Sequence, residues 1–222
     1  AVILSQFGFG ATIDFDDVTH KGITNISTDD VAVAQELGYV IKLVGDVREV
    51  ESGISAEVSP TFLLKNHPLA SVNDVMNAVF VESIGIGESM YYGPGAGQKP
   101  TATSVLADII RIARRLSDGN VGKPFNEFHR DLPLANPADV KSNYYFALDT
   151  PDEKGKILHL SEIFNSEDIS FEQVLQQKAN GTTARIVVIT HAMSKTQLKA
   201  VTEKLEAAED FTVVNTLKVL SN

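Results

Sequence analysis

The last eighty residues constrain the fold most strongly, because their apolar pattern alternates between strand and helix in a fixed order. Runs with strand character cover residues 144–148, 169–176, 184–190 and 211–220. Apolar residues at helical spacing lie between them: Ile157, Leu160 and Phe164, then Leu198, Val201 and Leu205. Ser194 and Gln197 have the spacing of a capping box at the start of the second helix. The resulting βαββαβ order predicts a ferredoxin-like module over residues 140–222.

The preceding residues predict a further α+β region, a mixed or antiparallel sheet with helices on one face, over residues 1–118. Two strand pairs are expected, and so are two helices, which Ser27 and Thr101 would cap. The expected strands cover 39–47, 55–59, 79–85 and 88–92, and apolar residues at helical spacing after Thr101 are Val105, Ile109, Ile112, Ala113 and Leu116. Residues 119–139 contain glycines and prolines without a period and predict a linker.

The first residues predict the end of a buried helix. Val2, Ile3, Phe7 and Phe9 are its apolar positions, and the chain starts with Ala in the middle of this pattern. A signal peptide is rejected, because no basic region precedes the apolar residues and polar residues interrupt them. We therefore expect the chain to be part of a longer protein.

Composition excludes several classes of protein. The chain has no cysteine, so disulfides, thiolate metal sites and a cysteine nucleophile are excluded. Its five histidines form no closely spaced pair, which argues against a metal site. The formal net charge of −10 without a basic run argues against binding to nucleic acid, and no apolar run has the ~20 residues that span a bilayer. The acidic pairs Asp16/Asp17, Asp29/Asp30 and Glu49/Glu51 are interpreted as caps or turns.

A glycine loop at Gly93, Gly95 and Gly97 is the strongest chemical signal, and these three residues are the candidate cofactor contacts. Glycine allows close approach of a ligand to the backbone, and the helix that follows offers free N–H groups to an anion. The spacing is not that of the dinucleotide fingerprint, and Lys99 is followed by Pro100, so the loop is not a Walker loop either. By shape alone, a plain turn and a ligand contact are equally compatible with it.

The turn after the first strand of the ferredoxin-like module is a second candidate site. Gly155, just before a helix, either frees N–H groups for a small carboxylate or forms a simple left-handed turn. Asp149 and Ile157 flank this turn. Gln173, on the following strand, either binds the same ligand or lies on a solvated edge. Asp149, Gly155, Ile157 and Gln173 are therefore the candidate effector contacts.

Several strings together resemble homoserine dehydrogenase across essentially the whole chain. They are Gly22–Ile26, Glu36–Leu43, Pro68–Val72, Asn77–Val79, Tyr92–Gly97 and Pro100–Ala102. The module from residue 140 resembles an ACT domain, the small-molecule sensing module of many amino-acid-biosynthesis enzymes, through Tyr144–Tyr145 and Ile169–Val174. One departure is Lys154, which stands where the ACT turn usually has proline before glycine.

This resemblance implies NAD(P)-dependent interconversion of L-homoserine and L-aspartate 4-semialdehyde in threonine and methionine biosynthesis. It implies a cytoplasmic homodimer with a small-molecule substrate, a possible amino-acid effector and no metal. The dinucleotide-binding half and the catalytic lysine of the family would precede Ala1, so this chain alone is expected to bind no cofactor and to be inactive. The alternative hypothesis is a stand-alone amino-acid-sensing or dimerisation protein of the ACT type.

Overall fold

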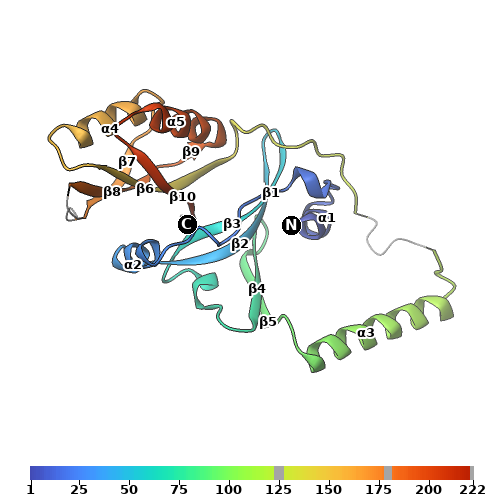
Figure 1. Ribbon diagram of the computed structural model, residues 1–222. Helices are drawn as coiled ribbons and strands as arrows, with labels where there is room; N and C mark the ends of the chain where they lie inside the picture. The colour runs from blue at the N-terminus through green and yellow to red at the C-terminus, as the bar shows by residue number, and fades with distance from the viewer. Residues whose placement is uncertain (123–127, 178–181, 221–222) are drawn as a thin grey trace. The chain divides into compact units, whose positions relative to one another are not determined.

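The computed structural model describes residues 1–122, 128–177 and 182–220 (Figure 1). The chain forms two compact units. The first unit combines Ala1–Leu64 with Phe128–Asn222, and the second unit is Lys65–Glu127. Two stretches far apart in the sequence therefore share one unit.

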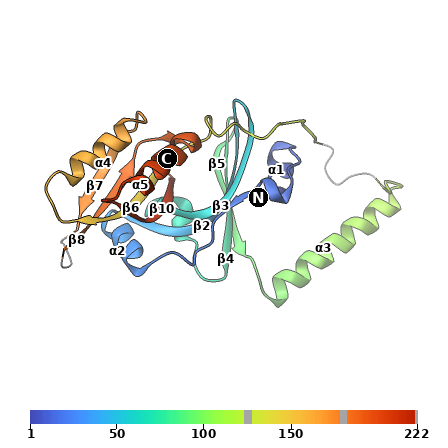
Figure 2. The ribbon, with the colours of Figure 1, turned by 45° about the horizontal axis from the view of Figure 1, so that its top comes forward.

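The βαββαβ order predicted for the end of the chain is confirmed. Its elements are β6 (Lys141–Pro151), α4 (Lys156–Asn165), β7 (Phe171–Gln176), β8 (Thr183–Thr190), α5 (Lys195–Ala207) and β10 (Thr212–Leu220). The strands lie in the order β10-β6-β8-β7 with antiparallel neighbours, and the two-residue β9 (Met193–Ser194) also pairs with β6. Both helices cover one face of this sheet (Figures 1 and 2).

The core of this module lies between the sheet and its two helices. Phe146 contacts Phe164 of α4 edge to face at 5.1 Å between ring centroids, and Val201 and Leu205 of α5 are fully buried beside them. Ser194 caps α5 and forms the predicted capping box with Gln197. Local pattern and tertiary packing agree here, because each predicted apolar face finds the same core.

The sheet continues beyond the module into the first sixty-four residues. β2 (Tyr39–Val50) and β3 (Gly53–Leu64) form a long antiparallel hairpin with its turn at residues 51–52. β3 pairs in parallel with β10, and with the two-residue β1 (Thr19–His20). α2 (Thr28–Glu36), capped by Ser27 as predicted, covers the sheet face opposite α4 and α5. A mixed sheet with helices, as the sequence predicts, is therefore present, but it has helices on both faces.

The first helix departs from its prediction. α1 (Val2–Phe9) forms, and the short helix η1 (Phe15–Asp17) follows it. The expectation that the apolar residues of α1 are buried is wrong for Ile3 and Phe7, which are 70% and 51% exposed. The helix instead turns Val2, Ser5 and Phe9 toward the core, and Ser5 is fully buried with its hydroxyl donating to the Ala11 carbonyl at 3.0 Å.

The second unit contains a short helix, a two-stranded hairpin and a long helix. Its elements are η2 (Pro68–Ser71), β4 (Met76–Ser83), β5 (Gly87–Pro94) and α3 (Gln98–Ser117). The prediction that Thr101 caps α3 is wrong: the helix begins at Gln98, and Gly97 is its N-cap. Proline is tolerated in a first turn because its missing N–H has no partner there, so Pro100 lies inside the helix rather than before it.

The expected division into 1–118, 119–139 and 140–222 stays a prediction about modules, while the compact units are divided differently. Residues 123–127 of the expected linker lie outside the described residues. Residues 128–139 contain neither helix nor strand, yet Arg130 and Leu134 form isolated bridges to Ala11 and Ile54. This part of the expected linker thus belongs to the first unit and contacts the first sixty-four residues.

Candidate functional site

The three glycines of the loop have three different surroundings. Gly93 is the second-last residue of β5 and lies opposite Asn77 of β4. A Cβ built on Gly93 meets no described atom within 4 Å. A Cβ on Gly95 would overlap the side chain of Asn77. Gly97 has φ +125°, a conformation that residues with a Cβ rarely adopt. Two of the glycines are therefore required by the fold itself, and only Gly93 is free of an internal explanation.

The helix start after the loop offers few free donors. Thr101 donates its N–H to the Gly97 carbonyl at 3.1 Å, and Pro100 has no N–H. Only the N–H groups of Gln98 and Lys99 remain in the first turn, so any anion bound here relies on two backbone donors and the dipole. α3 itself has no buried residue, and its apolar residues Val105, Ile109 and Leu116 are exposed.

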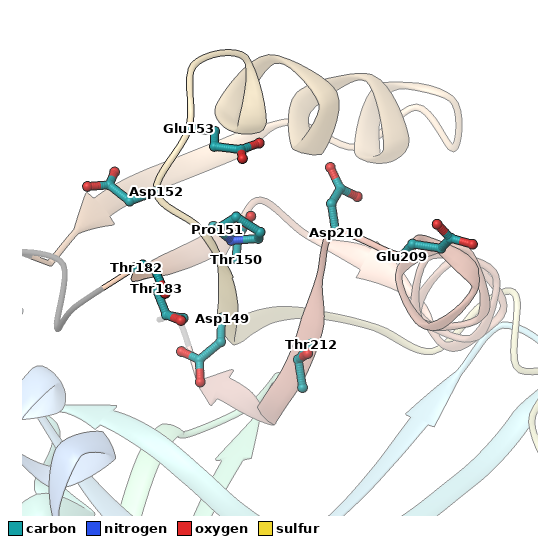
Figure 3. Close-up of a pocket in the computed structure, with 10 residues that line it drawn as sticks. All are labelled: Asp149, Thr150, Pro151, Asp152, Glu153, Thr182, Thr183, Glu209, Asp210 and Thr212. Carbon is teal, nitrogen blue, oxygen red and sulfur yellow. The ribbon is translucent and has the colours of Figure 1, made fainter.

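A hollow of about 600 Å³ lies at the end of β6 in the first unit (Figure 3). Its walls come from the end of β6 and the turn after it, from residues 182–183, and from the start of β10 with the turn before it. The lining residues are Asp149, Thr150, Pro151, Asp152, Glu153, Thr182, Thr183, Glu209, Asp210 and Thr212. Half of them are acidic, and the remainder are mostly threonines.

Neighbouring cations pair with three of these acids, and one of the pairs joins Lys156 to Glu153 at 3.5 Å. Arg185 holds Asp149 by two hydrogen bonds of 2.8 and 3.0 Å and also lies 3.6 Å from Asp29 of α2. Asp210 accepts from Lys156 at 3.3 Å and contacts His159 at 3.0 Å. Burial alone would raise the pKa of Asp210, but these two partners lower it. The hollow therefore keeps an excess of negative charge, which favours a cationic group over an anionic one.

The hydroxyl oxygen of Thr150, in the wall of the hollow, is a hydrogen-bonding group without a partner among the described residues. Thr150 is only 2% exposed, and its Oγ1 has no hydrogen-bond partner among the described residues. A buried polar atom without a partner costs free energy, so a donor at this position would stabilise the chain.

The four candidate effector residues do not meet in one place within a single chain. Asp149 lines the hollow, but Gly155, Ile157 and Gln173 are absent from its walls. Gly155 is the N-cap of α4 with φ +91°, and Ile157 is 41% exposed in the first turn. Gln173 lies on β7 and pairs with Ile189 of β8. β8 separates β7 from β6, the strand of Asp149.

The acidic pairs interpreted as caps or turns mostly have that role. Asp17 closes a capping box in η1. The interpretation is wrong for Glu49, which lies within β2 and pairs on the surface with Arg130 at 2.6 Å. Asp30 caps α2 as expected, but it is also buried and accepts from Tyr145 at 2.9 Å and from Asn215 at 3.0 Å. Burial alone would raise the pKa of Asp30, and the hydrogen bonds from Ser27, Asn215 and Tyr145 lower it.

Sequence reasoning missed a charge cluster between β2, β3, β10 and α5, in which two members, Glu57 and Lys218, are buried and the others are partly exposed. Asp46, Arg48, Glu57, Lys195 and Lys218 form it. The available signal was a single lysine within the apolar end of β10, where Lys218 stands between Leu217 and Val219. Among the described residues, no group of three or more side chains could hold a metal ion, and no helix is long and apolar enough to cross a membrane.

The fold thus defines the chain as an α+β protein in which a ferredoxin-like βαββαβ arrangement shares one sheet with the hairpin of the first residues. The family model described as homoserine dehydrogenase matches residues 1–110. Similarity to individual proteins extends over the rest of the chain as well. The chain therefore belongs to the homoserine dehydrogenase family.

Relatives and solved structures agree with this assignment. The chain is 58% identical over 220 residues to homoserine dehydrogenase from Lactococcus lactis, covering 99% of this chain and 51% of that protein. It is 34% identical to the Bacillus subtilis enzyme, covering 93% of this chain and 48% of that protein. A crystal structure of homoserine dehydrogenase from Thiobacillus denitrificans matches with a TM-score of 0.90 and 30% identity, covering 99% of this chain and 51% of that one. The chain spans about half the length of the relatives it matches.

Proposed function

We propose that this chain is the carboxyl-terminal half of an enzyme that interconverts L-homoserine and L-aspartate 4-semialdehyde with NAD(P), in threonine and methionine biosynthesis. The observation that carries the proposal is the 58% identity to a homoserine dehydrogenase over nearly the whole chain. The cofactor would supply the hydride, and the protein would supply binding and orientation. The catalytic lysine and the dinucleotide-binding half would belong to the part of the enzyme that precedes Ala1.

In this proposal the loop at Gly93, Gly95 and Gly97 forms one wall of the cofactor site. Gly93 supports it most directly, because neither its backbone conformation nor a neighbouring described atom requires glycine there. The exposed apolar residues of α3, such as Val105 and Ile109, would be covered by the other half of the enzyme. Burying them would stabilise the whole enzyme by the hydrophobic effect.

Substitution of Gly93 in the whole enzyme tests the cofactor site. We expect Gly93→Ala to raise the KM for the dinucleotide several-fold, because the new Cβ would stand between backbone and ligand. Gly85→Ala, at the turn of the same hairpin, is the matched control, because its Cβ also meets no described atom. An unchanged KM in Gly93→Ala would remove the loop from the cofactor site. The present chain alone should neither oxidise homoserine nor bind the dinucleotide.

We further propose that residues 140–222 are an ACT domain that binds an amino acid between two copies of the chain. The acidic hollow suits the ammonium group, and the N-terminus of α4 behind Gly155 suits the carboxylate. Ile157 and Gln173 would complete the site from the same chain or the partner. This arrangement makes the protein a homodimer.

Calorimetry with threonine, methionine and lysine tests the sensing role, and light scattering tests the dimer. We expect at least one amino acid to release heat and Asp149→Asn to abolish that heat. Glu203→Gln, on the exposed face of α5, should leave it unchanged. Absence of heat with every amino acid would reduce the module to a structural role, and a monomer would contradict the proposed site between copies. A stand-alone sensing protein is disfavoured, because the family match covers residues 1–110 outside this module.

A further inference from the structure

The charge cluster defined above lies where the first sixty-four residues meet the ferredoxin-like module. Lys218 of β10 is 5% exposed and forms ion pairs with both Asp46 of β2 and Glu57 of β3. Lys195, at the start of α5, contacts the second oxygen of Glu57 at 2.8 Å. Arg48 binds Asp46 through its Nε at 2.9 Å and donates to the carbonyl of Lys141 at 3.1 Å. Each carboxylate therefore has two cationic partners.

Each of the two carboxylates, on the β2–β3 hairpin, has at least one cationic partner from the ferredoxin-like module. Asp46, Arg48 and Glu57 belong to the β2–β3 hairpin, whereas Lys195 and Lys218 belong to the module. Opening the junction would separate Lys218 from both acids at once. If Lys218 alone is removed while the junction stays closed, both carboxylates lose their shared cation without gaining water, which is costly.

The backbone contribution to the same junction is small. β10 and β3 share three paired positions, Lys218–Thr61, Val219–Phe62 and Leu220–Leu63. By contrast, β10 and β6 share seven, and β2 and β3 share twelve. The junction is therefore much shorter than the strand pairings on either side of it, and Lys218 lies at its first pair.

A second polar contact from the same strand supports the coupling. Asn215 of β10 accepts from Lys21 at 3.1 Å and donates to Asp30 of α2 at 3.0 Å. Asp30 also accepts from Tyr145 of β6 at 2.9 Å. β10 thus holds the hairpin through Lys218 and α2 through Asn215, while its first residue, Thr212, lines the acidic hollow.

We propose that Lys218 and its ion pairs form a latch that makes the β2–β3 hairpin and the module open as one cooperative unit. A displacement of β10 must then move the hairpin with it. The latch gives the part of the chain that carries the family match a mechanical link to the module beyond it. It does not depend on whether the hollow binds an amino acid.

Hydrogen exchange of the present chain, measured by mass spectrometry, tests the latch. In the unaltered chain, we expect peptides of β2 and β3 to exchange with rates within a few-fold of those of β6 and β8. In Lys218→Met, exchange in β2 and β3 should rise on the order of 100-fold, with β6 and β8 unchanged, because the hairpin can then open alone. Lys199→Met, which removes an exposed lysine of α5, should change neither.

Other outcomes overturn the proposal. Faster exchange of the hairpin than of β6 and β8 in the unaltered chain would show that the two sides already open separately. An equal loss of protection everywhere in Lys218→Met would make the cluster a general stabiliser rather than a latch. If Lys218→Met does not fold, Glu57→Gln serves in its place, because it keeps the side-chain volume and weakens only one of the pairs of Lys218.

Discussion

At the scale of single residues, Gly53 shows how one position joins distant parts of the chain. It starts β3 with φ +142°, and a Cβ there would run into the carbonyl of Pro133. The next residue, Ile54, donates its N–H to that carbonyl at 2.9 Å and accepts from Ala135 at 2.9 Å. Nothing in the sequence indicates that residues 133–135 lie against Gly53.

We expect Gly53→Ala to lower the free energy of unfolding by about 2–3 kcal/mol, because it combines backbone strain with overlap of main-chain atoms that cannot rotate away. Urea denaturation of the chain measures this change. Gly22→Ala is the control, since Gly22 has no positive φ and no described atom near its Cβ. Equal stability of the two variants would show that the 133–135 segment moves aside at little cost.

At the scale of elements, local signals predicted most helices and strands well, and they failed where a cap has no side chain. Ser27 and Ser194 accept from the backbone N–H three residues on, as the capping-box pattern predicts. α3 instead begins after Gly97, whose contribution is a backbone conformation rather than a hydrogen bond. Thr101 was therefore mistaken for the N-cap, because threonine is a common N-cap residue and Gly97 offers no side chain that would indicate an earlier start.

Loss of the cap of α5 is expected to be measurable in isolation. Ser194→Ala should lower the free energy of unfolding by about 1 kcal/mol, since the N–H of Gln197 loses its acceptor. Ser161→Ala in α4 is the matched control, because its exposed hydroxyl only bonds back to the Ile157 carbonyl. Similar losses in both variants, compared by urea denaturation, would contradict a specific role of the cap.

At the scale of the whole molecule, buried carboxylates set the response of the chain to acid. Burial by itself would raise the pKa of Asp46 and of Glu57, but Lys218 together with Arg48 or Lys195 lowers both. Asp46 and Glu57 therefore release their protons more readily in the folded chain than in the unfolded chain, where carboxyl groups titrate at about pH 4. The stabilisation is complete above that pH and is lost as the pH falls through the lower folded values.

Accordingly, the urea midpoint should be nearly constant between pH 7 and about 5.5 and fall steeply below about pH 4. Lys218→Met should lower the free energy of opening of the β2–β3 hairpin, measured by hydrogen exchange, by about 3 kcal/mol at pH 7, because Asp46 and Glu57 lose a shared partner. That cost should shrink below about pH 4, where the two carboxyl groups take up protons and no longer need the cation. A cost for Lys218→Met that is independent of pH would show that packing, rather than charge, accounts for the effect.

The sequence by itself determined the elements of this protein and its family. Periodicity and caps identified the βαββαβ order, because strand and helix patterns depend on neighbours a few residues apart. The strings around Gly22, Gly38 and Gly93 together resembled homoserine dehydrogenase, because a family resemblance is carried by short runs of residues that can be read without the fold.

Only the tertiary structure decided how these parts share one core. Pairing of β3 with β10, the packing of residues 133–135 on Gly53, and the ion pairs of Lys218 each join positions more than seventy residues apart. Such contacts depend on which strands meet and in which register, and the charge of a lysine reveals nothing of the acids that will face it. For the same reason the sequence does not show that β8 lies between the strand of Asp149 and the strand of Gln173.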